Sequence, residues 1–385
     1  MYMLDKAMAG SCRYWSWMAF LLLLAAVGFV CYCRQLSYGL GITGMSRDVN
    51  WGIYVAQFTF FVGIAASAVM VVLPYYLHDV KQFGRITILG EFLAIAAVIM
   101  CMLFIFVDMG QPMRVFYVLL YPTLHSMMFW DMIALSGYLL LNAAISSAVL
   151  GCEYKRVPPP RWLRPVVLFS IPWAISIHTV TAFLYNGLPG RPLWFTAILA
   201  PRFLASAFAS GPALLILLCL LLRRLTSFDA GNEVIRRLGI IVAYAMTVNV
   251  FFLLVELFTA LYSHAPDHGE ALKYLFVGLE GKHPLAPYMW LSAGMAGAAL
   301  VALLVPSFRK NQRVLALASV LVFVSLWLEK GMGLIVAGFV PSPLGAVTTY
   351  APTAPELGIV LGVWATGALV LTVFYKITIS IREAS

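Results

Sequence analysis

The segment "RDVNWGIYVAQFTFFVGIAASAVMVVLPYYL", residues 47–77, decides the fold class of this chain. No charged residue follows Asp48 before Leu77, and about 20 consecutive apolar residues are enough to cross a bilayer as a helix. Within lipid, the backbone polar groups of such a run must pair inside the segment, which favours a helix. The alternation typical of membrane barrel strands is absent.

Similar apolar runs recur along the chain, which is 62% hydrophobic, only 11% charged and has a mean hydropathy of +0.92. A soluble domain is nearer half apolar and a quarter charged. The first run is followed by Cys31, Tyr32, Cys33 and Arg34 without a small-residue cleavage pattern, so we do not interpret it as a signal peptide. We predict an all-α polytopic membrane protein with ten transmembrane helices, at about 15–33, 51–77, 87–107, 127–150, 166–186, 203–222, 238–262, 285–306, 314–340 and 357–378.

The net charge of +9 is explained by where the 25 basic residues fall relative to these spans. The termini and the connections on their side hold seventeen, and Lys330 lies inside a span. Short cytoplasmic loops are enriched in Lys and Arg, which predicts a protein of the cytoplasmic (inner) membrane with both termini cytoplasmic. Nucleic acid is not needed to explain the charge. The opposite loops hold seven basic residues: Arg34, Arg47, Arg114, Arg191, Arg202, Lys273 and Lys282.

The six cysteines form no C-x-x-C, C-x-x-C-H or ferredoxin-like run, which argues against an iron–sulfur cluster or c-type haem in this chain. A b-haem needs two histidines at similar depth, and only the pair His125 and His178 offers that alternative. We expect no metal bound by the chain itself.

Ionisable groups within a bilayer are costly, so each is a candidate functional residue. Asp108 ends an outward-running span, and His125 and Asp131 begin the next one. At 1.5 Å per residue, His178 lies in the outer half of its span. The same applies to Glu256, Glu329 and Lys330, whereas Glu91 lies near the cytoplasmic end.

Structural roles stay open for several of these residues. Asp108 precedes Gly110 and Pro112 and could cap a turn, and His125 could be an ordinary interfacial residue. Glu329 and Lys330 could neutralise each other or partners on other helices.

Residues 47–77, together with "FVDMGQPMRVFYVLLYPTLHSMMFWDMIALSGYLLLN" (106–142), resemble the NrfD/PsrC family of quinone-reactive membrane subunits. The family's acidic turn appears as Asp108-Met109-Gly110-Gln111-Pro112, with Gln111 at the usual arginine position and Arg114 close by. The segment "FVPSPLGAVTTYAPTAPELGIVLGVWA" (339–365) is similar to the ten-helix, DsrP-type branch, which serves the Hmc, alternative complex III and Dsr systems.

The resemblance implies two four-helix bundles, 51–187 and 188–340, flanked by a segment with one helix at 1–50 and by an outer loop with the last helix at 341–385. It implies menaquinone or menaquinol as substrate, with no haem or iron–sulfur cluster held by this chain. The expected partners are a ferredoxin-like iron–sulfur subunit on the periplasmic face, a multihaem cytochrome c and other membrane or cytoplasmic redox subunits.

Our hypothesis for the site assigns proton transfer to His178 or Asp131. A proton acceptor works best when its pKa is near the working pH, which suits a histidine. Asp108, Arg114 and His125 would surround the quinone headgroup and the docking surface, where Asp108 and Arg114 could order the outer loop, relay protons to water or contact the partner. Tyr54 and Trp51 could stack on the ring or only anchor the helix. One alternative is a proton- or ion-translocating module that uses Glu91, Glu256, Glu329 and Lys330. A b-haem cytochrome subunit is the third interpretation.

Overall fold

The computed structural model describes residues 6, 8, 10–78, 80–263 and 266–384. The regular secondary structure of this part of the chain consists of helices. It contains ten helical segments long and apolar enough to cross a membrane, which confirms the predicted all-α polytopic fold. The spans are α2 (Cys12–Tyr38), α3 (Ile53–Ala65) with α4 (Val69–Tyr76), α5 (Thr87–Asp108), α7 (Met127–Lys155), α8 (Leu163–Asn186), α9 (Leu199–Leu225), α10 (Asn232–Tyr262), α12 (Ala286–Leu304), α14 (Gln312–Leu326) with α15 (Leu334–Ala337), and α16 (Ala354–Ala384).

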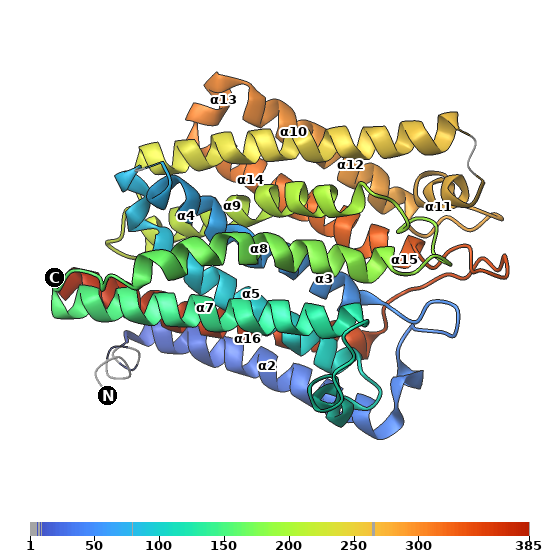
Figure 1. The fold of residues 1–385 in the computed structure, drawn as a ribbon, viewed down its shortest axis with the longest axis horizontal. Coiled ribbons are helices and arrows are strands. Elements are labelled where there is room, and N and C mark those ends of the chain that lie inside the picture. The colour runs from blue at the N-terminus through green and yellow to red at the C-terminus, as the bar shows by residue number, and fades with distance from the viewer. Residues whose placement is uncertain (1–5, 7, 9, 79, 264–265, 385) are drawn as a thin grey trace.

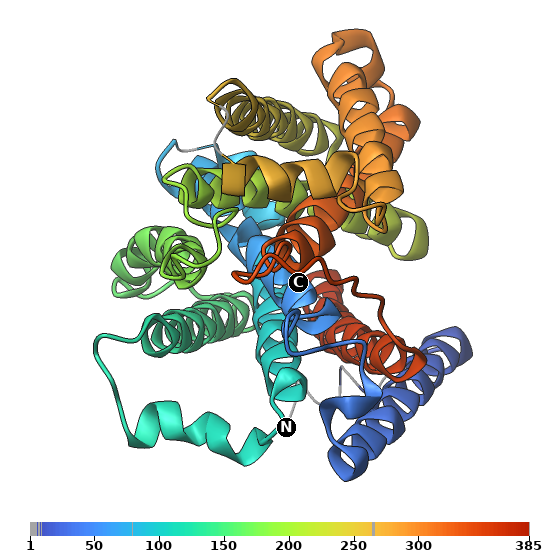
Figure 2. The same ribbon diagram turned by 90° about the vertical axis from the view of Figure 1, so that its right-hand side faces the viewer.

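The spans lie side by side, and α2 begins and α16 ends at the same end of the molecule, which we call the terminus end (Figure 1). The opposite end, here called the loop end, carries the connections 39–52, 109–126, 187–198, 277–285 and 338–353 (Figure 1). It also carries two short helices, α6 (Tyr117–Leu120) and α11 (Pro266–Phe276). The connection that contains α6 arches away from the helices in Figure 2.

Helix α3 lies near the centre of the molecule and α2 at its edge (Figure 2). Every residue of α3 is buried, and apolar residues lie on all sides of the helix. A helix that is apolar all round is expected either against lipid or inside a larger core, and the small residues of this one favour close contact with other helices. Helices α5 and α9 and the turn Trp327–Gly333 pack around it.

Helix α2 packs along α16, and glycines of both helices lie at their contact. A Cβ added to Gly28 would lie 2.5 Å from the Cα of Gly362, so the two backbones approach more closely than any side chain permits. This is the close contact of small residues that brings transmembrane helices together. Helix α16 also packs against α5, which joins the two ends of the sequence to the core.

The predicted division into two four-helix bundles stays a prediction. Helix α5 packs on α3 and α7, and α7 packs on α8, while α10 and α14 pack on α9 and α12 packs on both. Contacts between α3 and α9 and between α8 and α9 join the two groups of helices.

Two spans depart from regular α-helical geometry. A 3₁₀ turn, Ala66–Ala68, separates α3 from α4, and a π-helical turn, Trp327–Gly333, separates α14 from α15. Single π turns inside α-helices are often found at functional sites. This one contains Glu329 and Lys330, both buried.

Candidate functional site

One face of α8 carries three buried polar side chains, His178, Thr181 and Tyr185. Their spacings of three and four residues place them on the same side of the helix, one turn above another. The face is directed toward α3 and α7, because the Tyr185 hydroxyl lies 2.5 Å from Thr59 Oγ1 and Thr181 bonds to Asp131.

Asp131 lies in the second turn of α7 and is buried. Thr181 Oγ1 lies 2.6 Å from Asp131 Oδ1 and 2.7 Å from the carbonyl oxygen of Ile177. A hydroxyl has one proton and two lone pairs. Thr181 can therefore donate to the carboxylate, or donate to Ile177 and accept a proton held by Asp131. The pair accommodates Asp131 in either protonation state.

His178 has no exposed surface, and neither of its ring nitrogens has a hydrogen-bond partner within the described residues. A buried polar group left unpaired costs roughly 1–3 kcal/mol, so such groups are rare outside sites that bind something. Two free nitrogens, one able to donate and one able to accept, suit a polar ligand atom.

Aromatic rings close this region toward the loop end. Trp51 stacks on Trp194 with ring centroids 5.6 Å apart, and the edges of Tyr185 and Phe339 meet Trp51 at 5.7 Å. Trp194 is completely buried, and its Nε1 donates to the carbonyl oxygen of Leu334 at 2.8 Å. The cluster joins α8, the 39–52 and 187–198 connections and the start of the 338–353 connection, and through Tyr185 it borders the helical face that carries His178.

The structure groups the other predicted residues differently. Tyr54 donates to Gln35 Oε1 at 2.7 Å, and Gln35 donates to the carbonyl oxygen of Val107, so Tyr54 ties α3 to α2 and α5. Asp108 Oδ1 lies buried beside this network without a hydrogen-bond partner among the described residues.

Arg114 and His125 are exposed on the 109–126 connection. His125 is exposed whereas His178 is buried, so the two histidines do not share the burial that a pair of haem ligands needs. Figure 2 shows their connection standing away from the helices.

A second buried cluster centres on Arg202, which we had assigned to a loop; that assignment was wrong. Arg202 lies in the first turn of α9 and pairs with both Glu256 and Glu329. Its Nη2 lies 2.6 Å from Glu329 Oε1, and Asn249 Nδ2 donates to Glu329 Oε2 at 3.3 Å. Two carboxylates offset the guanidinium, so the cluster holds one net negative charge before its neighbours are counted.

Lys330 forms no ion pair with its neighbour Glu329, whose carboxylate pairs with Arg202 instead. Its Nζ lies 4.2 Å from the ring centroid of Phe203 and 3.5 Å from the Phe203 carbonyl oxygen. Glu91 lies apart from both clusters, where Ser146 donates to its Oε2 at 3.3 Å. Among the described residues, Glu256 and Glu329 share Arg202, while Glu91 and Lys330 have other contacts, and the proton path stays a prediction.

Sequence reasoning missed several polar partners, among them Thr59, Thr181, Tyr185 and Arg202. Residues Thr181 and Tyr185 could have been found, because their spacing from His178 puts them on one helical face. Arg202 gave a weaker signal, a single charge at the boundary of an apolar run. Thr59 gave none, because one threonine in an apolar helix is common.

Outside the spans, His268 of α11 extends the Arg202 cluster to the surface. Its Nε2 lies 3.6 Å from Glu256 Oε1, and its Nδ1 lies 2.9 Å from the carbonyl oxygen of Pro192. The Glu256 carboxylate and the Pro192 carbonyl raise the pKa of His268 above its usual value, against the opposing effects of burial and Arg202.

This shift predicts that the thermal stability of the protein falls as pH rises. A histidine whose folded pKa is raised stabilises the fold fully below its unfolded pKa, about 6.5, and loses that effect as pH passes the folded value. We expect the unfolding midpoint to fall by about 2 °C from pH 6 to pH 8.5, from a pair worth ~1 kcal/mol. His268→Gln should flatten this slope, and His283→Gln, an exposed loop histidine, should not. Equal slopes in both variants would refute the assignment.

This chain matches one family model and is similar to several known proteins. A family model described as "Polysulphide reductase, NrfD" matches residues 41–340. A Halobacterium salinarum protein, provisionally named as a membrane subunit of a dimethyl sulfoxide reductase, is 28% identical, over 92% of this chain and 89% of that protein.

Two further relatives have names that mention menaquinone chemistry. The Hdr-like menaquinol oxidoreductase integral membrane subunit of Archaeoglobus fulgidus is 26% identical, over 71% of this chain and 66% of that protein. The menaquinone reductase integral membrane subunit of Nitratidesulfovibrio vulgaris is 23% identical, over 94% and 91%. Because the family model covers most of the chain, including both buried clusters, this multi-pass membrane protein belongs to the polysulphide reductase NrfD family.

Proposed function

We propose that this chain is the quinone-reactive membrane subunit of a respiratory redox complex, exchanging electrons between menaquinol or menaquinone and an iron–sulfur partner. One observation carries the proposal: His178 lies fully buried with both ring nitrogens unpaired, on the helical face that also binds Asp131. The names of the Archaeoglobus and Nitratidesulfovibrio relatives support menaquinone as the substrate class.

Oxidation of a quinol releases two electrons and two protons. In the proposed reaction, a ring nitrogen of His178 accepts one proton from a quinol oxygen, and Asp131 accepts the other. Thr181 keeps a hydrogen bond to Asp131 in both protonation states. The two electrons would leave one at a time through the iron–sulfur partner, because an iron–sulfur cluster carries a single electron, and the reverse direction would reduce the quinone. A proton acceptor within hydrogen-bond reach of the substrate contributes typically 10²–10⁴-fold to rate.

The proposed orientation places the loop end in the periplasm and both termini in the cytoplasm. Its support is the excess of basic residues at the terminus end. The iron–sulfur subunit would then dock on the loop end, near the aromatic cluster around Trp51. A multihaem cytochrome c as a further partner, and a role in sulfur- or sulfite-linked metabolism, rest on the similarity of 339–365 to the DsrP-type branch.

A photoactivatable menaquinone analogue, applied to the complete complex in membranes, tests the site. We expect covalent adducts on α7 near Asp131 and on α8 between His178 and Tyr185, and excess menaquinol should suppress them. Adducts confined to other helices would contradict the proposal. An absorption spectrum of the same preparation, with the cytochrome subunit removed, tests the b-haem alternative.

A second candidate function, proton translocation, is favoured by the buried Arg202 cluster, which His268 connects to the loop end. The complex reconstituted in vesicles with a pH-sensitive dye tests it. Quinol oxidation that moves more protons than the quinol itself releases would support translocation, and a strict match to the quinol protons would exclude it.

A further inference from the structure

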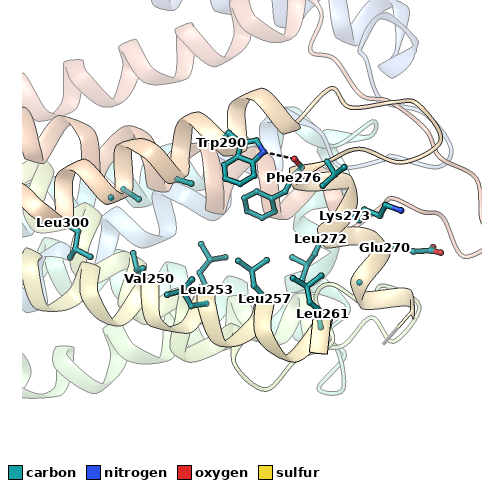
Figure 3. Close-up of a pocket in the computed structure, with 17 residues that line it drawn as sticks. Val250, Leu253, Leu257, Leu261, Glu270, Leu272, Lys273, Phe276, Trp290 and Leu300 are labelled. Carbon is teal, nitrogen blue, oxygen red and sulfur yellow. Dashed lines mark hydrogen bonds between the residues drawn. The ribbon is translucent and has the colours of Figure 1, made fainter. Parts of the chain in front are cut away.

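An apolar groove lies between α10, α11 and α12 (Figure 3), and neither His178 nor the Arg202 cluster is among the residues that line it. Its volume is about 760 Å³. Leucines of α10 form one wall, Trp290 and small residues of α12 form the other, and α11 closes the loop end (Figure 3). Nothing within the described residues fills it.

The groove has the depth of one lipid leaflet. Its α10 wall runs from Val250 to Leu261 and its α12 wall from Trp290 to Leu300, or roughly 16 Å and 15 Å of helix. Half of a hydrocarbon core about 30 Å thick is ~15 Å. A protein helix crossing one leaflet would displace on the order of 1,200 Å³, from a diameter of about 10 Å. A rigid helix of that size does not fit inside a groove of about 760 Å³, whereas flexible acyl chains can follow its shape and occupy it.

The interior lacks groups that could orient a quinone ring. Among the described lining residues, only Glu270, Lys273 and Trp290 carry a polar side chain. Trp290 Nε1 already donates to the carbonyl oxygen of Phe276 at 2.8 Å. Specific small-molecule sites combine apolar walls with a few convergent polar groups, and this groove has its remaining polar groups only at the rim.

The rim carries one charge of each sign. Glu270 and Lys273 lie three residues apart on α11, both exposed, at the loop end of the groove (Figure 3). A phospholipid with its chains between α10 and α12 would bring its headgroup to this rim. Lys273 matches a headgroup phosphate, whereas Glu270 matches a headgroup ammonium and disfavours a headgroup with only negative charge.

We propose that this groove binds one diacyl phospholipid with a zwitterionic amine headgroup, of the phosphatidylethanolamine class. The lipid fills the space between α10 and α12 and joins α11 to them. The site is separate from the quinone site, so the inference holds whether or not the chain reacts with quinones.

The test measures phospholipid retained by the complete complex after exhaustive washing in mild detergent. The host membrane should contain both phosphatidylethanolamine and phosphatidylglycerol. We expect about one phosphatidylethanolamine per chain. Gly297→Trp should lower this at least tenfold, because a Cβ at Gly297 meets open space and the larger side chain fills the groove. Gly294→Trp is the matched control, since Gly294 is equally open but does not line the groove.

The headgroup assignment has its own variant. Glu270→Lys should replace the retained phosphatidylethanolamine largely with phosphatidylglycerol, because both rim charges are then positive. Equal phosphatidylethanolamine retention in the wild-type, Gly297→Trp and Gly294→Trp complexes would overturn the site. So would a polypeptide, in place of lipid, cross-linked to residues of the groove. Unchanged headgroup preference in Glu270→Lys would overturn the role of the rim charges.

Discussion

Replacing His178 by leucine is expected to lower the rate of quinol oxidation by about 10²–10⁴-fold in the assembled complex, the usual contribution of a positioned acid or base. Leucine keeps the apolar volume but has no nitrogen to receive a proton. Because both imidazole nitrogens lack a partner among the described residues, the substitution breaks no hydrogen bond of the fold. The measurement is kcat with a soluble menaquinol analogue and an artificial electron acceptor.

Two further variants separate chemistry from structure. Asp131→Asn keeps a hydrogen bond to Thr181 but cannot take up a proton, so we expect a fall in kcat with little change in KM. Thr179→Val alters the neighbouring position on α8, where the hydroxyl contacts only its own helix, and should leave the rate unchanged. Wild-type kcat in both His178→Leu and Asp131→Asn, with the complex fully assembled, would rule out these residues as proton acceptors.

Replacing Arg202 by methionine is expected to destabilise the protein by about 3–5 kcal/mol, the cost of removing one partner from a buried ion pair. The cause is the two remaining carboxylates, Glu256 and Glu329, which would lie buried without the guanidinium that pairs with both, while Glu256 would keep its longer contact with His268. We expect little assembled complex in membranes and a clearly lower unfolding midpoint, measured by detergent extraction and thermal unfolding.

The control variant replaces the two carboxylates that Arg202 neutralises by neutral amides. Arg202→Met combined with Glu256→Gln and Glu329→Gln should recover most of the lost stability, because buried ion pairs replaced by neutral groups are often close to neutral in effect. Arg202→Lys should recover only part, since an ammonium cannot match two carboxylates with a planar fork. If the triple variant were no more stable than Arg202→Met, the loss would have to come from packing rather than from charge.

The spans were predictable from sequence because lipid imposes one requirement on each of them separately. The run 51–77 corresponds to Ile53–Tyr76 and the run 166–186 to Leu163–Asn186, within a few residues. Helix α11 was not predicted, because it lies outside the membrane and its sequence is not continuously apolar. The 3₁₀ turn at Ala66–Ala68 was also missed, since the small residues there fit an α-helix equally well.

The candidate site was predictable only in part. Burial of His178 and Asp131 follows from their position in apolar runs, and the common helical face of α8 follows from spacing. The partners of Arg202 lie 54 and 127 residues farther along the chain, and no local pattern indicates which helices meet there. The orientation of Tyr54 toward Gln35, rather than toward His178, depended on the packing of α2 in the same way.

The π-helical turn Trp327–Gly333 gives the ninth span one more residue than a regular helix would need over the same rise. Each α-helical residue adds about 100° of rotation. If all seven residues of the turn wound as regular α-helix, the extra residue would turn α15 by about that angle relative to α14. The indole contact of Trp194 with Leu334 would be lost, while Glu329 could keep its place beside Arg202. The extra residue of the π turn therefore sets the orientation of α15, and of the aromatic cluster around Trp51, independently of the orientation of the Arg202 cluster.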